Sequence, residues 1–377
     1  MNLSLTEEQL LIKSSAEKYF RDNLPFDERS KIIISRGEDY KKIIHDCKEL
    51  GWYALPFSEK YGGIGGSTTD VMTLIETFGA SLHVDPFIFS VLFPGKVIEN
   101  FCNDKDKNYY LNQIINGNLK IAYCFAEPSH RFNFLKIGCK VHLENNKYYL
   151  TGKKILVIGA TEAELFLVAA KDKNNNVYLL KIVNNNKNFL CQNYSVIDDS
   201  LASDIVFDNF EFQDDDILVK IKYEEFIKKI EIIYDYLTLA TCSEALGVIE
   251  KMYQLTLDYV KTREQFGKKI GDFQVIQHRM VDIYIKKEEM RSLNYSAQVS
   301  FYDNYNSENI AKNICLNKIF LDTKAKEISQ DCIQLHGGMG VANEMSIGHY
   351  FKKITFLSML FGDSDYHYRR YEKVDKA

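Results

Sequence analysis

The 377-residue sequence has no excess of positive charge. Its formal net charge is -5 and its isoelectric point is about 6.0, so it lacks the basic field that neutralises nucleic-acid phosphates. We therefore expect no nucleic acid among its partners. No stretch approaches the roughly 18 consecutive apolar residues of a membrane span, and no basic segment followed by an apolar run stands at the start. These features predict a cytoplasmic protein without a membrane span.

The sequence also lacks clustered ligands for a metal or a disulfide framework. Its eight cysteines stand singly, without a CxxC pair or a His-rich cluster. Zinc sites and disulfide scaffolds need closely spaced ligands or paired cysteines, whereas isolated thiols are typical of a reducing compartment. We expect no metal site.

The chain is too long for one ordinary hydrophobic core, and its residue pattern changes twice along its length. Helical periodicity gives way to short β-rich segments with polar turns, and long helical segments then return. The predicted domains are an N-terminal α-helical domain (1–118), a middle β-domain (119–217) and a C-terminal domain (218–377). The predicted fold is an α+β multidomain protein with a middle antiparallel β-barrel or sandwich and a C-terminal four-helix bundle.

Individual elements follow from the same periodicities. Candidate strands are 119–126, 137–144, 147–157, 164–170, 176–183 and 205–212. The four long helical segments are 223–262, 273–303, 308–335 and 344–374. The glycine-rich stretch 62–66 follows no predicted strand and lacks phosphate-loop spacing, so we interpret it as a structural loop.

The most informative motif lies in the C-terminal part. Arg263-Glu264-Gln265-Phe266-Gly267 is followed by Phe273-Gln274 and then by Gln334-Leu335-His336-Gly337-Gly338-Met339-Gly340. The stretch 259–282 resembles the acyl-CoA dehydrogenase signature RxxFGxxIxxFQxxQxxxAD, and the resemblance extends over the whole chain in domain order. That family consists of flavoproteins. The resemblance therefore implies an FAD cofactor held between the bundle and the β-domain, at a homo- or hetero-oligomeric interface.

Six residues correspond to the family's cofactor contacts. The resemblance implies that Arg263 pairs with the FAD pyrophosphate, and that Phe266 and Gln274 lie near the adenosine. It places Gln334 and the Gly337-Gly338 turn close to the pyrophosphate. The residue types fit, because a dianionic pyrophosphate favours a guanidinium and adjacent glycines permit close backbone approach. Taken singly, the arginine is better explained as half of a surface ion pair, and the glycines as a helix end; only the joint pattern favours cofactor binding.

Two β-domain segments resemble the family more weakly. The stretch 122–128 is similar to the CxTEP segment, with Ala126 in place of the threonine. The stretch 149–160 is similar to the LxGxKxWITxA strand, with Leu156 in place of the tryptophan and Ile158 in place of the threonine. These changes imply a flavin pocket with fewer polar contacts to the ring.

The family's catalytic base has no obvious counterpart. Oxidation of an acyl thioester at Cα–Cβ requires a carboxylate that takes the α-proton. Phe361 and Leu237 stand at the two positions where family members carry that glutamate. Glu244 lies seven residues after Leu237, on the same helix face about 10.5 Å further along. Asp363, beside the first position, is the other candidate.

Plainer interpretations stay open for each candidate base. Glu244 also suits an ion pair with a neighbouring lysine or arginine, and Asp363 suits a helix cap. His336 and His367 fit structural hydrogen-bonding roles better than catalytic ones.

The empty glutamate positions resemble the subgroup of the family whose members act as unlike paired subunits. The predicted function is FAD-dependent α,β-dehydrogenation of an acyl thioester in fatty acid or lipid metabolism. The expected partners are acyl-CoA or an acyl-carrier thioester, and an electron-transfer flavoprotein or similar acceptor. Two alternatives remain: a non-catalytic partner subunit that completes another chain's FAD site, and a flavin monooxygenase on the same fold.

Overall fold

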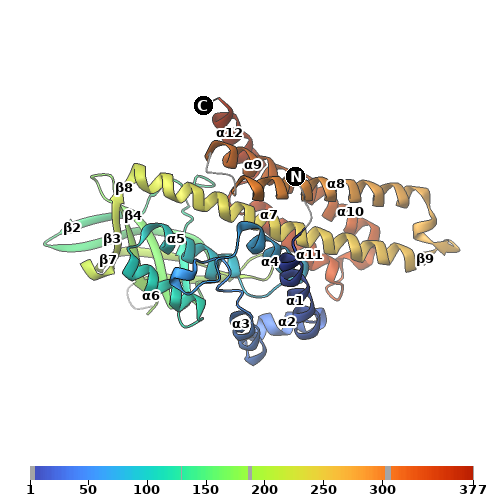
Figure 1. The fold of residues 1–377 in the computed structure, drawn as a ribbon, viewed down its shortest axis with the longest axis horizontal. Helices are drawn as coiled ribbons and strands as arrows, with labels where there is room; N and C mark the ends of the chain where they lie inside the picture. Colours follow the sequence, from blue (N-terminus) through green and yellow to red (C-terminus); the bar gives the residue numbers. More distant parts are fainter. Residues whose placement is uncertain (1–4, 129, 186–188, 302–306, 377) are drawn as a thin grey trace. The chain divides into compact units, whose positions relative to one another are not determined.

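The computed structural model describes residues 5–128, 130–185, 189–301 and 307–376 (Figure 1). The chain groups into two compact units. Unit 1 comprises the residues up to Tyr40, Ser67–Val84 and the residues from Thr238 onwards, whereas unit 2 comprises Lys41–Gly66 and Asp85–Leu237. The units combine segments that lie far apart in the sequence. The bounds of the three domains predicted along the chain therefore stay a prediction.

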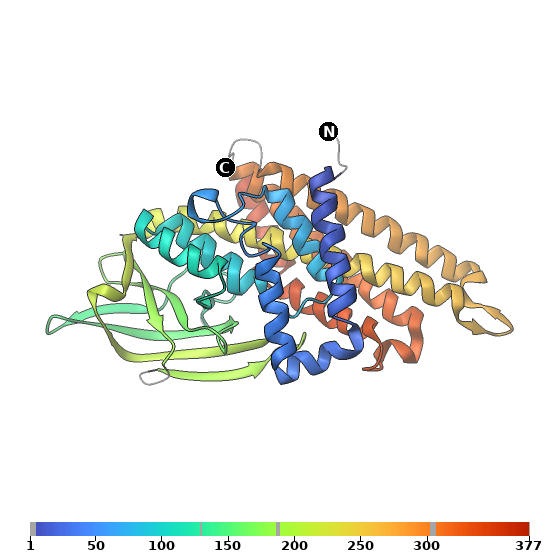
Figure 2. The same cartoon turned by 60° about the horizontal axis from the view of Figure 1, so that its bottom comes forward.

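The N-terminal part is helical, as predicted. Its helices are α1 (Glu7–Asn23), α2 (Phe26–Ser35), α3 (Glu38–Glu49), α4 (Thr68–Ala80), α5 (Phe93–Phe101) and α6 (Asp104–Ile115), with a π turn at Ile88–Leu92. Local sequence signals set two of the starts. The Thr6 and Gln9 side chains form a capping box at α1, and Ser67 and Asp70 form another at α4. In unit 1, α1 packs against α4 (Figure 2).

The middle part folds into one sheet in unit 2. Its strands are β1 (Ile121–Cys124), β2 (Lys140–Glu144), β3 (Lys147–Ile158), β4 (Leu165–Lys171), β5 (Asn176–Val183), β6 (Leu190–Ser195), β7 (Leu201–Phe212) and β8 (Ile217–Lys222). The order is β6-β7-β3-β2-β4-β5-β8, with β1 paired to β4. In the described residues β6 and β8 each have one neighbour, so the barrel is not closed. The β1 and β2 pairings with β4 are parallel, which corrects the expectation of a fully antiparallel sheet.

The two edge strands are the ones that the sequence did not predict. The residues of β6 and β8 are half-buried or exposed, and none is fully buried. β4, in contrast, is buried along six of its seven residues and lies at the centre of the sheet. A hydrophobic core that includes Leu150, Phe166 and Phe207 packs around it. The period-two signal weakens at an edge because both strand faces are partly solvated.

The C-terminal part is helical again. Its helices are α7 (Tyr223–Thr262), α8 (Gln274–Ser300), α9 (Ser307–Phe320), α10 (Lys326–His336), α11 (Ser346–Met359) and α12 (Ser364–Asp375). A π turn, Leu321–Ala325, joins α9 to α10. The predicted segment 344–374 is interrupted at 360–363, where Phe361 and Gly362 have φ of 55° and 109° and cannot continue a helix. The order of helical, sheet and helical parts is confirmed, and the four-helix bundle stays a prediction.

Among the described helices, α7 alone has the length and apolar composition of a membrane span. However, 83% of its most apolar window is buried within the protein, as in the core helix of a globular protein.

Candidate functional site

Arg263 lies in the tight connection that follows α7 in unit 1. Its backbone N–H donates to the carbonyl of Tyr259 at 2.8 Å, and its own carbonyl accepts from Ile270 at 2.9 Å. The hairpin of β9 (Glu264–Gln265) and β10 (Lys268–Lys269) extends beyond the ends of α7 and α8 (Figure 1). In the described part of the chain the Arg263 side chain, which is exposed, has no carboxylate partner. Its charge is therefore available to an external anion.

The two residues expected near the adenosine lie next to this arginine. Phe266 is 92% exposed at the tip of the hairpin, where its φ is 54°. Its ring meets the ring of Phe273 edge-on, with 6.3 Å between centroids. Gln274 directly follows Phe273 as the first residue of α8, and its side chain is exposed. The Phe266 ring is therefore open to contact by a ligand or another chain.

The glycine pair forms an open turn after α10. Gly337 has φ of 58°, and its N–H donates to the carbonyl of Gln334, whose side chain is exposed. A Cβ added at Gly337 or Gly338 would meet nothing within 4 Å. Packing within the chain therefore does not require glycine at 338. The open backbone suits close approach by an external group, so the residues present fit a pyrophosphate.

An aromatic contact brings the two motifs together. The rings of Tyr259 and His336 stack with 4.4 Å between centroids, and the Tyr259 hydroxyl donates to the His336 carbonyl at 3.4 Å. Tyr259 lies one helical turn before Arg263, and His336 directly precedes Gly337. Nothing in the sequence predicts this stack, because the two residues belong to separate helices.

The two histidines in question have structural contacts. His336 Nδ1 donates to the Cys332 carbonyl at 2.8 Å, and burial lowers its pKa. His367 Nε2 donates to the Phe361 carbonyl at 3.0 Å, and burial lowers its pKa to about 3. Both are therefore neutral hydrogen-bond donors at neutral pH, in keeping with the structural interpretation.

Neither usual position for the catalytic base carries a polar group. Leu237 is fully buried in α7, within unit 2. Phe361 is 2% exposed in the turn between α11 and α12, within unit 1.

Glu244 lies inside unit 1 and is ion-paired. Its carboxylate accepts from Lys353 of α11 at 2.8 Å, and the two side chains are only 13% and 12% exposed. The backbones of α7 and α4 touch beside it, because a Cβ at Gly247 would lie 1.8 Å from the Glu76 carbonyl oxygen. This environment matches the ion-pair interpretation and leaves the base role a prediction.

Asp363 caps a helix. It is the residue before α12, and its carboxylate accepts from the backbone N–H of Tyr366 at 2.9 Å. This contact matches the capping interpretation, and the role of Asp363 as a base likewise stays a prediction.

The two β-domain segments expected to face the flavin ring are neighbours in unit 2. The N–H of Ile155 donates to the Ala126 carbonyl at 2.9 Å. Lys154 of one segment and Glu127 of the other form a buried ion pair of 2.6 Å, and the backbone of Gly138 donates to the same carboxylate at 2.7 Å. These partners hold the pKa of Glu127 below its usual range, despite the opposing effect of burial. This buried ion pair therefore links the two segments.

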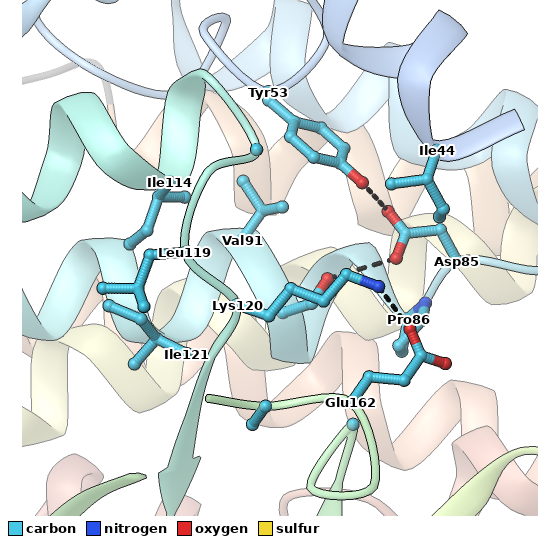
Figure 3. A pocket seen from close by; sticks show the side chains of 14 residues that line it. Ile44, Tyr53, Asp85, Pro86, Val91, Ile114, Leu119, Lys120, Ile121 and Glu162 are labelled. Atoms are coloured by element: carbon cyan, nitrogen blue, oxygen red, sulfur yellow. Dashed lines mark hydrogen bonds and ion pairs between the residues drawn. The ribbon is translucent and has the colours of Figure 1, made fainter. Parts of the chain in front are cut away.

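Unit 2 also has a small pocket that none of the predicted site residues lines (Figure 3). Polar contacts join several of the lining residues: Tyr53 and Ser90 donate to Asp85 at 2.7 and 3.3 Å, and Lys120 pairs with Glu162 at 2.6 Å. Its cavity volume of about 30 Å³ suits one or two water molecules. The pocket is far smaller than a site for an acyl chain or a flavin, which takes several hundred Å³.

Comparison with known proteins identifies the family. The model of the acyl-CoA dehydrogenase N-terminal domain matches residues 6–118, and that of the acyl-CoA dehydrogenase C-terminal domain matches residues 236–374. The two matches cover about two thirds of the chain. It belongs to the acyl-CoA dehydrogenase family, and the resemblance read from the Arg263 and Gly337 motifs is confirmed. FAD as the cofactor and CH–CH oxidoreduction as the reaction type are confirmed at the level of the family.

Individual relatives are distant but span the whole chain. The 3-(aryl)acrylate reductase of Clostridium sporogenes (strain ATCC 15579) is 23% identical over 96% of both chains. The butyryl-CoA dehydrogenase from Megasphaera elsdenii has a similar fold, with a TM-score of 0.88, 19% identity and full coverage of both chains. The ChsE4-ChsE5 complex from Mycobacterium tuberculosis gives a TM-score of 0.85 at 17% identity, covering 99% of this chain and 98% of that one. The unlike-subunit subgroup stays a prediction.

Proposed function

We propose that this chain is an FAD-dependent oxidoreductase of acyl thioesters that holds the FAD pyrophosphate with Arg263, Gln334 and the Gly337-Gly338 turn. The observation that carries the proposal is the stack of Tyr259 on His336, which joins the helix end before Arg263 to the helix end before the open glycine turn. Within the described residues, no carboxylate pairs with the Arg263 guanidinium. When bound, FAD supplies the oxidant for a CH–CH bond. The chain's own residues bind and orient it, with Phe266 and Gln274 on the adenosine side.

We propose that a second subunit covers this surface. Several large apolar side chains are exposed on the Arg263 hairpin, the first half of α8 and the glycine turn; they are Phe266, Val275, Val281, Tyr284, Ile285, Met339 and Val341. Three of them, Val281, Tyr284 and Ile285, share one face of α8 by their spacing. An apolar surface of this kind is usual at subunit interfaces. It suits a homo-oligomer or a pair of unlike subunits.

Dehydrogenation also requires a base for the α-proton. We propose Glu244 as the first candidate within the chain and Asp363 as the second. Each carboxylate already has a partner, Lys353 and the backbone of Tyr366 respectively. Glu244 would have to exchange the Lys353 ammonium for the α-proton of the substrate.

A second candidate function is a partner subunit without catalysis of its own. The specific observation in its favour is that Leu237 and Phe361 fill both base positions with buried apolar side chains. The ChsE4-ChsE5 complex has a similar fold and is named as an assembly of two different proteins. In this role the chain would contribute Arg263 and the glycine turn to a cofactor whose chemistry occurs on the other subunit.

The remaining expectations follow from the family. We propose acyl-CoA or an acyl-carrier thioester as the substrate, and an electron-transfer flavoprotein or a similar protein as the electron acceptor. All eight cysteines are free, which supports a reducing, cytoplasmic location.

The visible spectrum of the purified chain tests the proposal. Flavin absorbance that is bleached by an acyl-CoA under anaerobic conditions supports the oxidoreductase. Flavin that no acyl thioester bleaches, or a colourless protein that binds flavin only when mixed with a second chain, supports the partner subunit. A protein that binds no FAD in either form contradicts both.

A further inference from the structure

A buried lysine lies beneath the turn that joins α11 to α12. Lys318 of α9 is 0% exposed, and its Nζ donates to the carbonyls of Leu357 at 2.7 Å and Ser358 at 3.0 Å. These carbonyls belong to the last turn of α11, where C=O groups have no α-helical partner. Burying an ammonium is costly unless it is hydrogen-bonded. Here it meets two carbonyls at the negative end of a helix dipole.

Two further side chains bind backbone groups between Phe361 and Ser364, in the second half of the turn. Asp322, one turn after Lys318, accepts from the backbone N–H of Ser364 at 2.8 Å and pairs with Lys326. His367 Nε2 donates to the Phe361 carbonyl at 3.0 Å. We call Lys318, Asp322 and His367 the clamp. Its members come from α9, the π turn and α12, and together they bind four backbone groups between Leu357 and Ser364.

The turn that the clamp holds is conformationally unfavourable. Phe361 has φ of 55°, in the left-handed region that bulky residues avoid. Its side chain is also only 2% exposed, so contact with water does not stabilise this conformation. Such a backbone persists only where its surroundings over-determine it, and it is concentrated at functional sites. Helices that end in a left-handed residue most often use glycine at that position.

We propose that Lys318 is a positioning residue: with Asp322 and His367 it fixes the place of the side chain at position 361. The family resemblance puts a catalytic carboxylate at that position in most members. In this chain the clamp therefore presents a phenyl ring where others present the base. The catalytic meaning of position 361 rests on the proposed function, whereas the clamp itself rests on the contacts above.

Hydrogen exchange of the full-length protein tests the clamp. Loss of hydrogen bonds from a charged donor should open the turn, so Lys318→Met should speed exchange of the 360–367 amides by about 10-fold or more. The matched control is Lys324→Met, which removes a lysine from the same stretch whose partner is Glu327. It should leave the turn unchanged, and β4 amides should exchange equally in all variants. Unchanged exchange at 360–367 in folded Lys318→Met would overturn the proposal.

The wild type and a milder variant keep the test decisive if Lys318→Met does not fold. Lys318→Gln retains a shorter donor and should show a smaller acceleration at the same amides. In the wild type, the Ser364 amide, which donates to Asp322, should exchange far more slowly than the same amide in an unstructured peptide. A rate equal to that of the unstructured peptide would show that no clamp operates.

Flavin reduction by an acyl-CoA tests the positioning role of Lys318 independently. Phe361→Glu places a carboxylate at the clamped position and should increase flavin reduction by an acyl-CoA. The double variant Lys318→Met/Phe361→Glu should lose that gain while it keeps its FAD, because Arg263 and Gly338 lie outside the clamp. A double variant that keeps the full gain contradicts positioning by Lys318. A chain that binds no flavin contradicts the proposed function, and hydrogen exchange then decides the clamp alone.

Discussion

The Tyr259 ring stacks on His336 with 4.4 Å between centroids, and its hydroxyl donates to the carbonyl of the same residue. This contact fixes the end of α7 against the end of α10. Arg263 lies one helical turn after Tyr259, and Gly337 directly follows His336. The position of the proposed pyrophosphate site therefore depends on a side-chain contact that is internal to unit 1.

We expect Arg263→Ala to retain much less FAD than Lys261→Ala. A charge-assisted pair to pyrophosphate contributes about 1.5–3 kcal/mol, which corresponds to roughly 10- to 150-fold in affinity. Both side chains are exposed, so neither change should affect folding. The measurement is the ratio of flavin absorbance to protein absorbance after gel filtration. Equal flavin content in the two variants would remove Arg263 from the site.

Gly338→Ala separates cofactor binding from stability. The new Cβ meets nothing within 4 Å in the protein, so the free energy of unfolding should change by less than about 0.5 kcal/mol. The same methyl group should obstruct a pyrophosphate and lower FAD affinity. Gly340→Ala is the contrasting control, because its Cβ would lie 2.6 Å from the Ile333 carbonyl oxygen and should destabilise the protein. Thermal unfolding and flavin titration of both variants check this, and full FAD affinity in Gly338→Ala would contradict it.

The flavin-loaded protein should be an oligomer. The family resemblance places the adenosine half of FAD at a subunit boundary, and Phe266 is 92% exposed there. Replacing Val281 and Ile285 of α8 by Ser should weaken association and lower FAD retention together, because both depend on one surface. Leu143→Ser, an equally exposed apolar residue on β2 in unit 2, is the control. Sedimentation velocity measures the assembly, and a monomer with full, tightly held FAD would refute the expectation.

The sequence predicted the features that depend on local patterns. α7 runs over the predicted 223–262, and the cofactor motifs lie at the ends of helices, as their residue types require. The interruption at 360–363 was not predicted, because apolar periodicity continues across it. Around the left-handed Phe361, Lys318 binds the Leu357 carbonyl and His367 binds the Phe361 carbonyl, and no local pattern encodes these contacts.

The same reasoning explains what the sequence left open at the site. Glu244 was recognised as a carboxylate in an apolar stretch, but its partner Lys353 lies more than a hundred residues later. Ion pairs between helices depend on packing angles and helix register. The sequence alone is therefore compatible with Glu244 as a base and with Glu244 as a member of an ion pair. The contact with Lys353 shows that the Glu244 carboxylate has to leave this ion pair before it can accept a proton.

The buried amine of Lys318 should make stability depend on pH in a defined window. Burial lowers its pKa from 10.5 to about 8, although Cys242, Asp322 and Asp363 oppose this shift and Lys326 adds to it. Between these values the unfolded state binds more protons than the folded state, so stability rises with pH. The contribution is complete above pH 10.5 and is lost as the pH falls through 8.

Comparison with Lys318→Met isolates this term, since the other titrating groups are common to both proteins. The free energy of unfolding of the wild type, minus that of the variant, should increase from pH 8 to pH 10. Urea unfolding at unit steps of pH measures it. A difference that stays constant or falls over this range would show that the amine titrates normally.

Glu244→Gln tests the base within the chain. If this carboxylate removes the α-proton, the amide should lower flavin reduction by an acyl-CoA by about 10²–10⁴-fold and leave FAD content unchanged, because it keeps the size of the side chain but cannot accept the proton. Lys353→Met is the matched control, since it breaks the same 2.8 Å ion pair without removing the carboxylate. Both variants should lose stability through the broken pair, but only Glu244→Gln should lose reduction. Equal loss of reduction in the two would assign Glu244 a structural role. Normal reduction by Glu244→Gln with loss in Asp363→Asn would transfer the base to Asp363, and normal reduction in both would exclude both carboxylates.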